Sequence, residues 1–139
     1  MDVNFNRLRE ALRVIEEFFR FILEEEESCV ALKKMRHSLT GMEKRIGYDL
    51  LLKSRDTAGD CFASQTRPEE MNRIERSDVL SANFKRAQEA GRVIEEYSKL
   101  SGAEDVSHSA KEIRFSLYSL QKATFMSVES EAWRVGREE

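Results

Sequence analysis

The 139-residue sequence has few of the residues that interrupt helices or mark special protein classes: one proline, six glycines and two cysteines. Scarce proline and glycine leave few breaks in a chain, which favours long helices. Cys29 and Cys61 lack the spacing of a metal or redox motif, so we expect free thiols in a reducing compartment. No apolar run approaches the ~20 residues of a membrane span. These absences exclude a disulfide scaffold, a cysteine-ligated metal motif and a membrane-spanning protein.

Charge of neither sign dominates, since 23 Lys and Arg residues face 26 Asp and Glu residues and the pI is near 5.6. We therefore expect neither nucleic acid nor a membrane surface as a partner. The opening residues, MDVNFNRLRE, lack the apolar stretch of a secretory signal, so we expect a cytoplasmic protein. With 40% hydrophobic and 35% charged residues, the composition is typical of a soluble helix-rich domain.

Two segments of the sequence each have a similar second copy later in the chain. NFNRLREALRVIEE begins at Asn4 and NFKRAQEAGRVIEE at Asn83, with ten of fourteen positions identical. KKMRHSLTGMEK begins at Lys33 and KEIRFSLYSLQK at Lys111, with five of twelve identical. The offset is 79 residues for the first match and 78 for the second, so we predict a duplicated unit with one residue gained or lost.

The duplicated unit has the periodicity of an amphipathic hairpin. At 100° per residue, one stripe of the first helix collects Leu8, Ala11, Ile15, Phe18, Phe19 and Ile22. Two such hairpins close most simply as a bundle. We therefore predict one all-α domain over residues 1–139, a four-helix bundle built from two duplicated helical hairpins (4–46 and 83–124) joined by a central loop, the unduplicated joint at 53–67.

Capping signals and breaks in the periodicity set the expected ends of the other helices. A capping box begins at Thr66, and Ser101-Gly102 is a stop signal. The expected boundaries are Ser28–Leu52 for the second helix, Thr66–Leu100 with a break near Ser77 for the third, and Asp105–Glu129 for the last.

Repeated polar residues on the apolar stripe are candidates for function. Asn4 and Asn83 lie in the middle of their stripes. Asn4 could cap its helix, whereas Asn83 could do so only if its helix began later than predicted. A role common to both would be a buried hydrogen bond, either structural or to a ligand.

Two pairs of repeated arginines lie near the apolar direction. Arg7 and Arg86 are on the edge of the stripe, each three residues before a glutamate, so each could form a local ion pair. Arg36 and Arg114 lie one turn before a core leucine, where an unpaired guanidinium would cost several kcal/mol. These two need either a structural salt bridge or a bound phosphate.

The repeated Glu-Glu pairs fall opposite the stripe. In the first copy Glu16 and Glu17 share that side with Arg13 and Arg20. Pairs four residues apart, such as Arg13 with Glu17, stabilise a helix by a few tenths of a kcal/mol. We expect these charges to be solvated.

The joint, which has no second copy, concentrates reactive groups in the run Arg55-Asp56-Thr57-Ala58-Gly59-Asp60. Asp56 and Asp60 could hold Mg²⁺, which prefers oxygen ligands and keeps several waters. Arg55 beside them could contact a phosphate with paired donors. The alternative is an ordinary turn in which these side chains cap backbone groups.

The order of these motifs resembles a known family. Asn-x-x-Arg-x-x-Glu-Ala-x-Arg-Val-x-Glu-Glu, Arg-x-x-Leu, Arg-Asp-Thr-x-Gly-Asp and a second copy of the first motif are similar to a small helical domain of thiamine biosynthesis. That domain occurs alone or fused ahead of thiamine-phosphate synthase, and is described as a hydroxymethylpyrimidine-phosphate kinase. The likeness runs from Asn4 to about Lys122. Ala58, Cys61, Phe62 and Gly91 depart from the family's pattern.

The resemblance implies transfer of a phosphoryl group from ATP, with Mg²⁺, to 4-amino-5-hydroxymethyl-2-methylpyrimidine phosphate. Its expected partners are these two small molecules and thiamine-phosphate synthase. Combined with the motif positions, it predicts catalytic residues Arg55, Asp56 and Asp60, with Asp56 and Asp60 binding the metal. The expected substrate- and phosphate-binding residues are Asn4, Arg7, Arg36, Thr57, Asn83, Arg86 and Arg114.

Two other functions fit parts of the sequence. His37-Ser38-Leu39-Thr40-Gly41 resembles the motif of a histidine phosphotransfer bundle, with His37 away from the core stripe. Against that function, Thr40 replaces a lysine, and Phe115 occupies the position equivalent to His37. The second alternative is a non-catalytic helical partner of thiamine-phosphate synthase.

Overall fold

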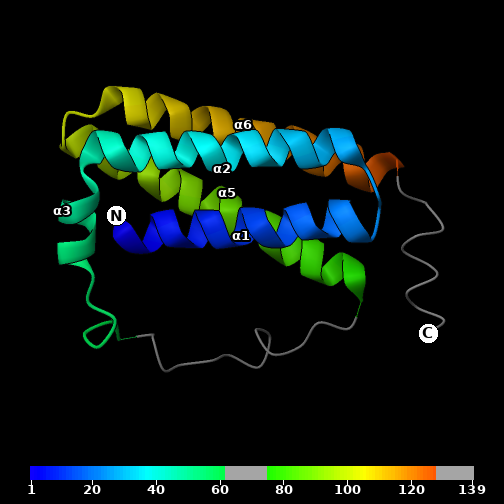
Figure 1. Ribbon diagram of the computed structural model, residues 1–139, viewed down its shortest axis with the longest axis horizontal. Helices are drawn as coiled ribbons and strands as arrows, with labels where there is room; N and C mark the ends of the chain where they lie inside the picture. The colour runs from blue at the N-terminus through cyan, green and yellow to red at the C-terminus, as the bar shows by residue number, and fades with distance from the viewer. Residues whose placement is uncertain (62–74, 128–139) are drawn as a thin grey trace.

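The computed structural model describes residues 1–61 and 75–127. Its four long helices are α1 (Asp2–Phe21), α2 (Glu26–Ile46), α5 (Arg76–Leu100) and α6 (Glu104–Ser127), and the short α3 (Tyr48–Ser54) follows α2 (Figure 1). No strand occurs in the described ranges, so the all-α prediction is confirmed there. The duplication itself stays a prediction from the sequence.

The four long helices pack side by side. α1 contacts α2 and α5, and α6 contacts α5 and α2. In Figure 1, α1 starts at the side of the molecule where α5 ends, so the first helices of the two hairpins cross antiparallel. Each long helix contributes fully buried side chains to one core, which includes Phe5, Leu8, Leu12, Ile15, Phe19, Leu32, Leu39, Leu80, Phe84, Ile94, Val106 and Leu117.

Several expected boundaries are confirmed. α5 begins at Arg76, near the predicted break, where the Glu75 backbone N–H donates to the Asp78 carboxylate at 3.0 Å in a capping box. It ends at Leu100, and Gly102 then takes φ +71°, as a stop signal requires. The expected start at Thr66 lies outside the described residues.

The predicted end of the second helix was wrong. α2 ends at Ile46, because Gly47 adopts φ +111°, and the separate helix α3 continues to Ser54. The break changes the helical phase. Leu51 is therefore buried, while Leu50 is 64% exposed although it follows Met42 and Ile46 at the four-residue spacing of an apolar stripe.

The first helix also begins earlier than a cap at Asn4 would require. α1 starts at Asp2 with Met1 in the capping position, so Asn4 lies within its first turn and is not an N-cap. α6 starts at Glu104, one residue before the predicted Asp105. The predicted end of this helix at Glu129 lies outside the described residues.

Candidate functional site

A groove between α1 and α5 is lined by the same five residue types from each helix. It has a volume of about 670 Å³. α1 contributes Asn4, Arg7, Glu10, Ala11 and Val14, and α5 contributes Asn83, Arg86, Glu89, Ala90 and Val93. Each residue on α5 is 79 positions after its counterpart on α1, so the groove has two chemically equivalent halves.

The two halves face opposite ways along the groove, because α1 and α5 are antiparallel (Figure 1). Each lining set spans ten helical steps, which at about 1.5 Å rise per residue gives a length of ~15 Å. The asparagine is the first member of each set, at the outer end of its half, and the arginine follows one turn nearer the middle.

Arg7 and Arg86 are both exposed and line this groove. Within residues 1–61 and 75–127, neither guanidinium forms an ion pair. The local pairs with Glu10 and Glu89 that the sequence allowed are therefore not formed. Two accessible cations in a polar groove are suited to binding an anionic ligand.

The two asparagines line the same groove at different depths. Asn83 is 8% exposed, and its Nδ2 donates to the Val79 carbonyl oxygen at 2.8 Å. This hydrogen bond fixes the amide through its nitrogen and leaves Oδ1 able to accept a further hydrogen bond. Asn4 is half-buried. The structural role weighed for Asn83 is thus present, and its oxygen remains suited to a ligand's donor.

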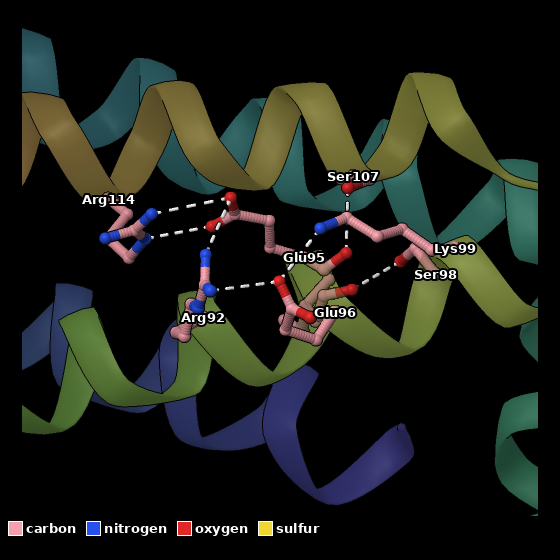
Figure 2. A network of polar contacts seen from close by, with 8 residues as sticks. Arg92, Glu95, Glu96, Ser98, Lys99, Ser107 and Arg114 are labelled. Atoms are coloured by element: carbon pink, nitrogen blue, oxygen red, sulfur yellow. Dashed lines mark hydrogen bonds and ion pairs between the residues drawn. The ribbon is translucent and has the colours of Figure 1, made fainter.

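Arg36 and Arg114 are bound by carboxylates of the neighbouring helix. Arg36 Nε donates to Glu16 at 2.6 Å. Arg114 donates to Glu95 from Nε at 2.9 Å and from Nη2 at 3.4 Å (Figure 2). The hydrogen bond to Glu95 raises the pKa of the Arg114 guanidinium. Of the two alternatives for these arginines, the described structure contains the salt bridge.

The expectation that Glu16 and Glu95 are solvated was wrong. Glu16 is 9% exposed and Glu95 is 4% exposed. The helical wheel of one helix places them opposite its apolar stripe, but a second helix covers that side and supplies the arginine. The second glutamate of each Glu-Glu pair is more accessible and forms the expected pair with an arginine four residues earlier, with Arg13 Nη2 at 3.4 Å from Glu17.

Glu95 is the centre of a wider network that ties α5 to α6. Arg92 lies 3.2 Å from Glu95 and 3.1 Å from Glu96, and Lys99 lies 2.9 Å from Glu96 (Figure 2). The hydrogen bond from Lys99 lowers the pKa of Glu96. Ser107 Oγ on α6 donates to the Glu95 backbone carbonyl at 2.7 Å. The buried carboxylate is therefore held at both its side chain and its backbone.

A further buried pair was missed from the sequence. The Arg9 guanidinium contacts the Glu43 carboxylate, which is buried, and joins α1 to α2. At the equivalent positions of the second hairpin, Gln88 Nε2 donates to Gln121 Oε1 at 2.7 Å. Applying the two repeat offsets to the sequence shows that Arg9 and Glu43 are both replaced by glutamine in the second hairpin. That paired replacement is the sequence signal that would have predicted this contact.

The joint is attached to the start of α1. Arg55 donates to the Asp2 carboxylate from Nε at 2.7 Å and from Nη2 at 3.1 Å. This hydrogen bond holds the pKa of the buried Asp2 below its ordinary value and raises that of Arg55. Arg55 therefore already has a carboxylate partner at the end of α1 where Asn4 lies.

The acidic residues of the joint lie outside the groove lining. The Asp56 carboxylate accepts the Gly59 N–H at 2.7 Å, which is the turn that the sequence offered as an alternative. Asp56 and Thr57 are exposed, and Asp60 is half-buried. In the described part of the chain, no three His, Cys, Asp or Glu residues are grouped as a metal site.

His37 is exposed on α2, as predicted. It lines a shallow hollow together with Arg9, Lys33, Lys34 and Arg36. Arg9 and Arg36 in this lining are each paired with a buried glutamate, so its net positive charge comes from Lys33 and Lys34. No helix in the described ranges is both long and apolar enough to cross a membrane.

These features define an all-helical domain with a groove between α1 and α5. Each of the two helices contributes one asparagine amide and one arginine guanidinium to the groove. The chain belongs to the ThiD2 family, whose model matches residues 1–123. It is similar to thiamine-phosphate synthases of cyanobacteria, with 39% identity over 121 residues to that of Prochlorococcus marinus (87% of this chain, 34% of the relative). The identity is 41% over 123 residues to that of Thermosynechococcus vestitus (88% and 34%).

The chain thus spans about a third of the length of the curated relatives it matches. No solved structure matches it. The family connects the chain with thiamine biosynthesis, whereas the reaction is not specified by these similarities.

Proposed function

We propose that this protein transfers a phosphoryl group from ATP to 4-amino-5-hydroxymethyl-2-methylpyrimidine phosphate. The product would be the diphosphate, which thiamine-phosphate synthase, the proposed partner, consumes. Membership of the ThiD2 family supports the pathway. The observation that carries the reaction is the groove itself, which offers two exposed and unpaired arginines, Arg7 and Arg86, to two phosphorylated molecules.

In the proposed reaction, an oxygen of the acceptor's phosphate attacks the γ-phosphorus of ATP. A new P–O bond forms there as the bond to the β–γ bridging oxygen breaks, and ADP leaves. The charges balance, because a dianionic monoester and a tetra-anionic ATP give two trianionic products. No proton has to move, so the protein needs positioning and charge neutralisation more than a general base.

Direct contact with phosphate falls to Arg7 and Arg86 in this proposal. Arg36 and Arg114 were expected to share that role, but each is held by a buried glutamate at 2.6 and 2.9 Å. Their proposed role is to fix α2 on α1 and α6 on α5. That packing sets the position of the two helices that line the groove.

Magnesium is proposed to accompany the nucleotide and to neutralise charge on the transferred phosphoryl group when bound. Mg²⁺ usually needs only one or two protein carboxylates besides substrate phosphates and waters. Asp56 and Asp60 remain the proposed ligands, although neither lines the groove. In this proposal they act from the end of α1 where Arg55 is bound to Asp2. One Asp56 oxygen is already bound to the Gly59 N–H. Asp56→Asn is the informative variant, because an amide oxygen can still accept that N–H while the charge is lost.

The test is an ADP-release assay with the pyrimidine monophosphate, run with and without Mg²⁺. We expect Arg7→Gln and Arg86→Gln each to lower turnover efficiency by about tenfold or more, because each removes charge-assisted hydrogen bonds. Arg20→Gln on α1 and Lys85→Gln on α5 are matched controls, since both residues are exposed and neither lines the groove. Asp56→Asn should lower the rate measured with Mg²⁺ and leave the rate measured without Mg²⁺ unchanged.

Binding of both substrates without ADP release would contradict this proposal and favour the non-catalytic partner of the synthase. The histidine phosphotransfer function is favoured by the exposure of His37. It predicts an acid-labile label on His37 after incubation with a phosphorylated receiver domain, and loss of that label in His37→Gln. The kinase proposal predicts no label, with ADP release unchanged in the same variant.

A further inference from the structure

The groove's two equivalent halves require an explanation beyond a single binding site. Asn4, Arg7 and Glu10 on α1 have counterparts of the same type on α5. Sites for one asymmetric ligand are usually built from unlike groups, because specificity comes from a few differently placed polar contacts. Two like half-sites are suited to two ligands of like chemistry.

We propose that the groove holds the phosphate donor and the phosphate acceptor at the same time, one in each half, in opposite orientations. This inference rests on the proposed function. Half-site A comprises Asn4, Arg7 and Glu10, and half-site B comprises their α5 counterparts Asn83, Arg86 and Glu89. Each half-site takes an aminopyrimidine ring at its asparagine and a phosphate at its arginine.

The two substrates share the chemistry that such half-sites would recognise. The six-membered ring of adenine is a pyrimidine with an amino group beside a ring nitrogen, and the acceptor has the same arrangement. An asparagine amide can pair with such an edge through two hydrogen bonds, its oxygen accepting from the amine and its N–H donating to the ring nitrogen. The same amide geometry serves at the N6 amine and N7 of adenine in DNA. In half-site B, the bond from Asn83 to Val79 leaves the amide oxygen to accept from the exocyclic amine.

The direction of the helices brings the two phosphates together. In each half the arginine lies three residues beyond the asparagine, which is about 4.5 Å nearer the middle of the groove. Because α1 and α5 run antiparallel (Figure 1), the order of the lining residues brings the two arginines toward the middle from opposite ends. Ligands held ring-outward would therefore meet phosphate to phosphate, which is the arrangement that in-line transfer needs.

The test is calorimetric titration of wild type, Arg7→Gln and Arg86→Gln with two probes, the pyrimidine monophosphate and the non-hydrolysable imido analogue of ATP. We expect wild type to bind each probe when it is already saturated with the other. One variant should lose about tenfold or more affinity for the nucleotide alone, and the other variant the same for the pyrimidine phosphate alone. Arg20→Gln and Lys85→Gln should bind both probes as wild type does.

Mutually exclusive binding of the probes would overturn the inference, and so would loss of the same ligand in both arginine variants. Turnover measured on the same samples separates the two proposals. ADP release without the reciprocal loss of affinity would overturn the half-sites and leave the kinase. Reciprocal binding without ADP release would overturn the kinase and leave two half-sites for aminopyrimidine phosphates.

Discussion

The hairpin α1–α2 and the hairpin α5–α6 each have polar side-chain contacts between their helices. One of these contacts is of the same kind in both hairpins, and another differs. Both have a buried glutamate on the first helix bound to an arginine on the second, Glu16 with Arg36 and Glu95 with Arg114. The first hairpin adds the ion pair of Arg9 with Glu43, whereas the second has two glutamines hydrogen-bonded at those positions.

This difference teaches which positions require a particular residue and which require only a compatible partner. A pair that serves helix packing alone can change if both members change together, since an amide pair satisfies itself as an ion pair does. The groove residues show the opposite behaviour, because all five are the same type in both halves. Packing does not require that identity at exposed Arg7 and Arg86, and binding would.

The shared contact is also more enclosed in the second hairpin. The Arg114 side chain is 14% exposed, against 24% for Arg36. Phe115 and Tyr118 cover the Arg114 guanidinium, with ring centroids at 4.9 and 5.9 Å. The equivalent positions of the first hairpin hold His37 and Thr40. The two copies of one ion pair should therefore differ in strength.

The largest expected effect tests that difference. Glu95→Ala should lower the free energy of unfolding by about 3 kcal/mol, because it leaves the enclosed Arg114 without its carboxylate. Glu16→Ala should cost about 2 kcal/mol, since Arg36 can reach water. Denaturant unfolding measures both. Glu96→Ala, at an exposed ion pair, is the control and should cost less than about 1 kcal/mol. Equal losses for Glu95 and Glu16 would contradict the comparison.

The next effect converts one hairpin's contact into the other's. Arg9→Gln should destabilise by about 2 kcal/mol, because the buried Glu43 loses its cation. The double variant Arg9→Gln/Glu43→Gln recreates the amide pair of the second hairpin and should return to within about 1 kcal/mol of wild type. If the double variant loses as much unfolding free energy as the two single variants together, the amide pair of the second hairpin cannot replace the ion pair in the first.

A third prediction concerns Gly91, which stands where the first hairpin has the buried Leu12. An added Cβ there would lie 3.7 Å from the Arg114 Cβ and 3.8 Å from the Ala110 carbonyl oxygen, ordinary contact distances. Gly91→Ala should therefore stabilise the protein by up to about 1 kcal/mol through helix propensity. Gly41→Ala, with open space around its Cβ, is the matched control. If Gly91→Ala destabilises the protein and Gly41→Ala does not, the close packing of α5 against α6 requires a residue without a side chain at position 91.

The smallest effect is a pH dependence that comes from the contact between Asp2 and Arg55. Arg55 lowers the Asp2 pKa in the folded state, so the contact stabilises the fold fully above the unfolded pKa of about 3.9. That contribution is lost as the pH falls below this value through the folded pKa. Asp2→Asn should show a shallower loss of stability in the same acid window. Parallel curves for the two proteins in denaturant unfolding would contradict the ion pair.

The sequence predicted the helices well where the information was local. The stripe of α1 needed only its own 3.6-residue period, and the members Leu8, Ala11 and Ile15 are buried as expected. The stop at Gly102 was equally local. The break at Gly47 was missed, since the apolar stripe continued past it and a helix tolerates many single glycines.

The candidate site was predicted less well, because it depends on which helices are neighbours. The asparagines and Arg7 and Arg86 were recognised as unusual from their place on the stripe, and the structure gathers them in one groove. The joint's Arg55 was expected to meet a phosphate, but it is bound to Asp2, 53 residues earlier in the chain. No spacing rule within the joint could identify that partner.

By itself, the sequence determined the helical class, the two similar hairpins as a prediction, and the polar residues that helix formation alone does not require. These conclusions follow from the composition and from patterns that can be read along the chain without knowing which helices are neighbours. The tertiary structure decided that Glu16 and Glu95 are buried, which carboxylate holds each arginine, and that Arg7 and Arg86 share one groove. Those outcomes depend on the crossing of α1 with α5 and on the helices that cover them, and such packing brings together side chains that no local pattern connects.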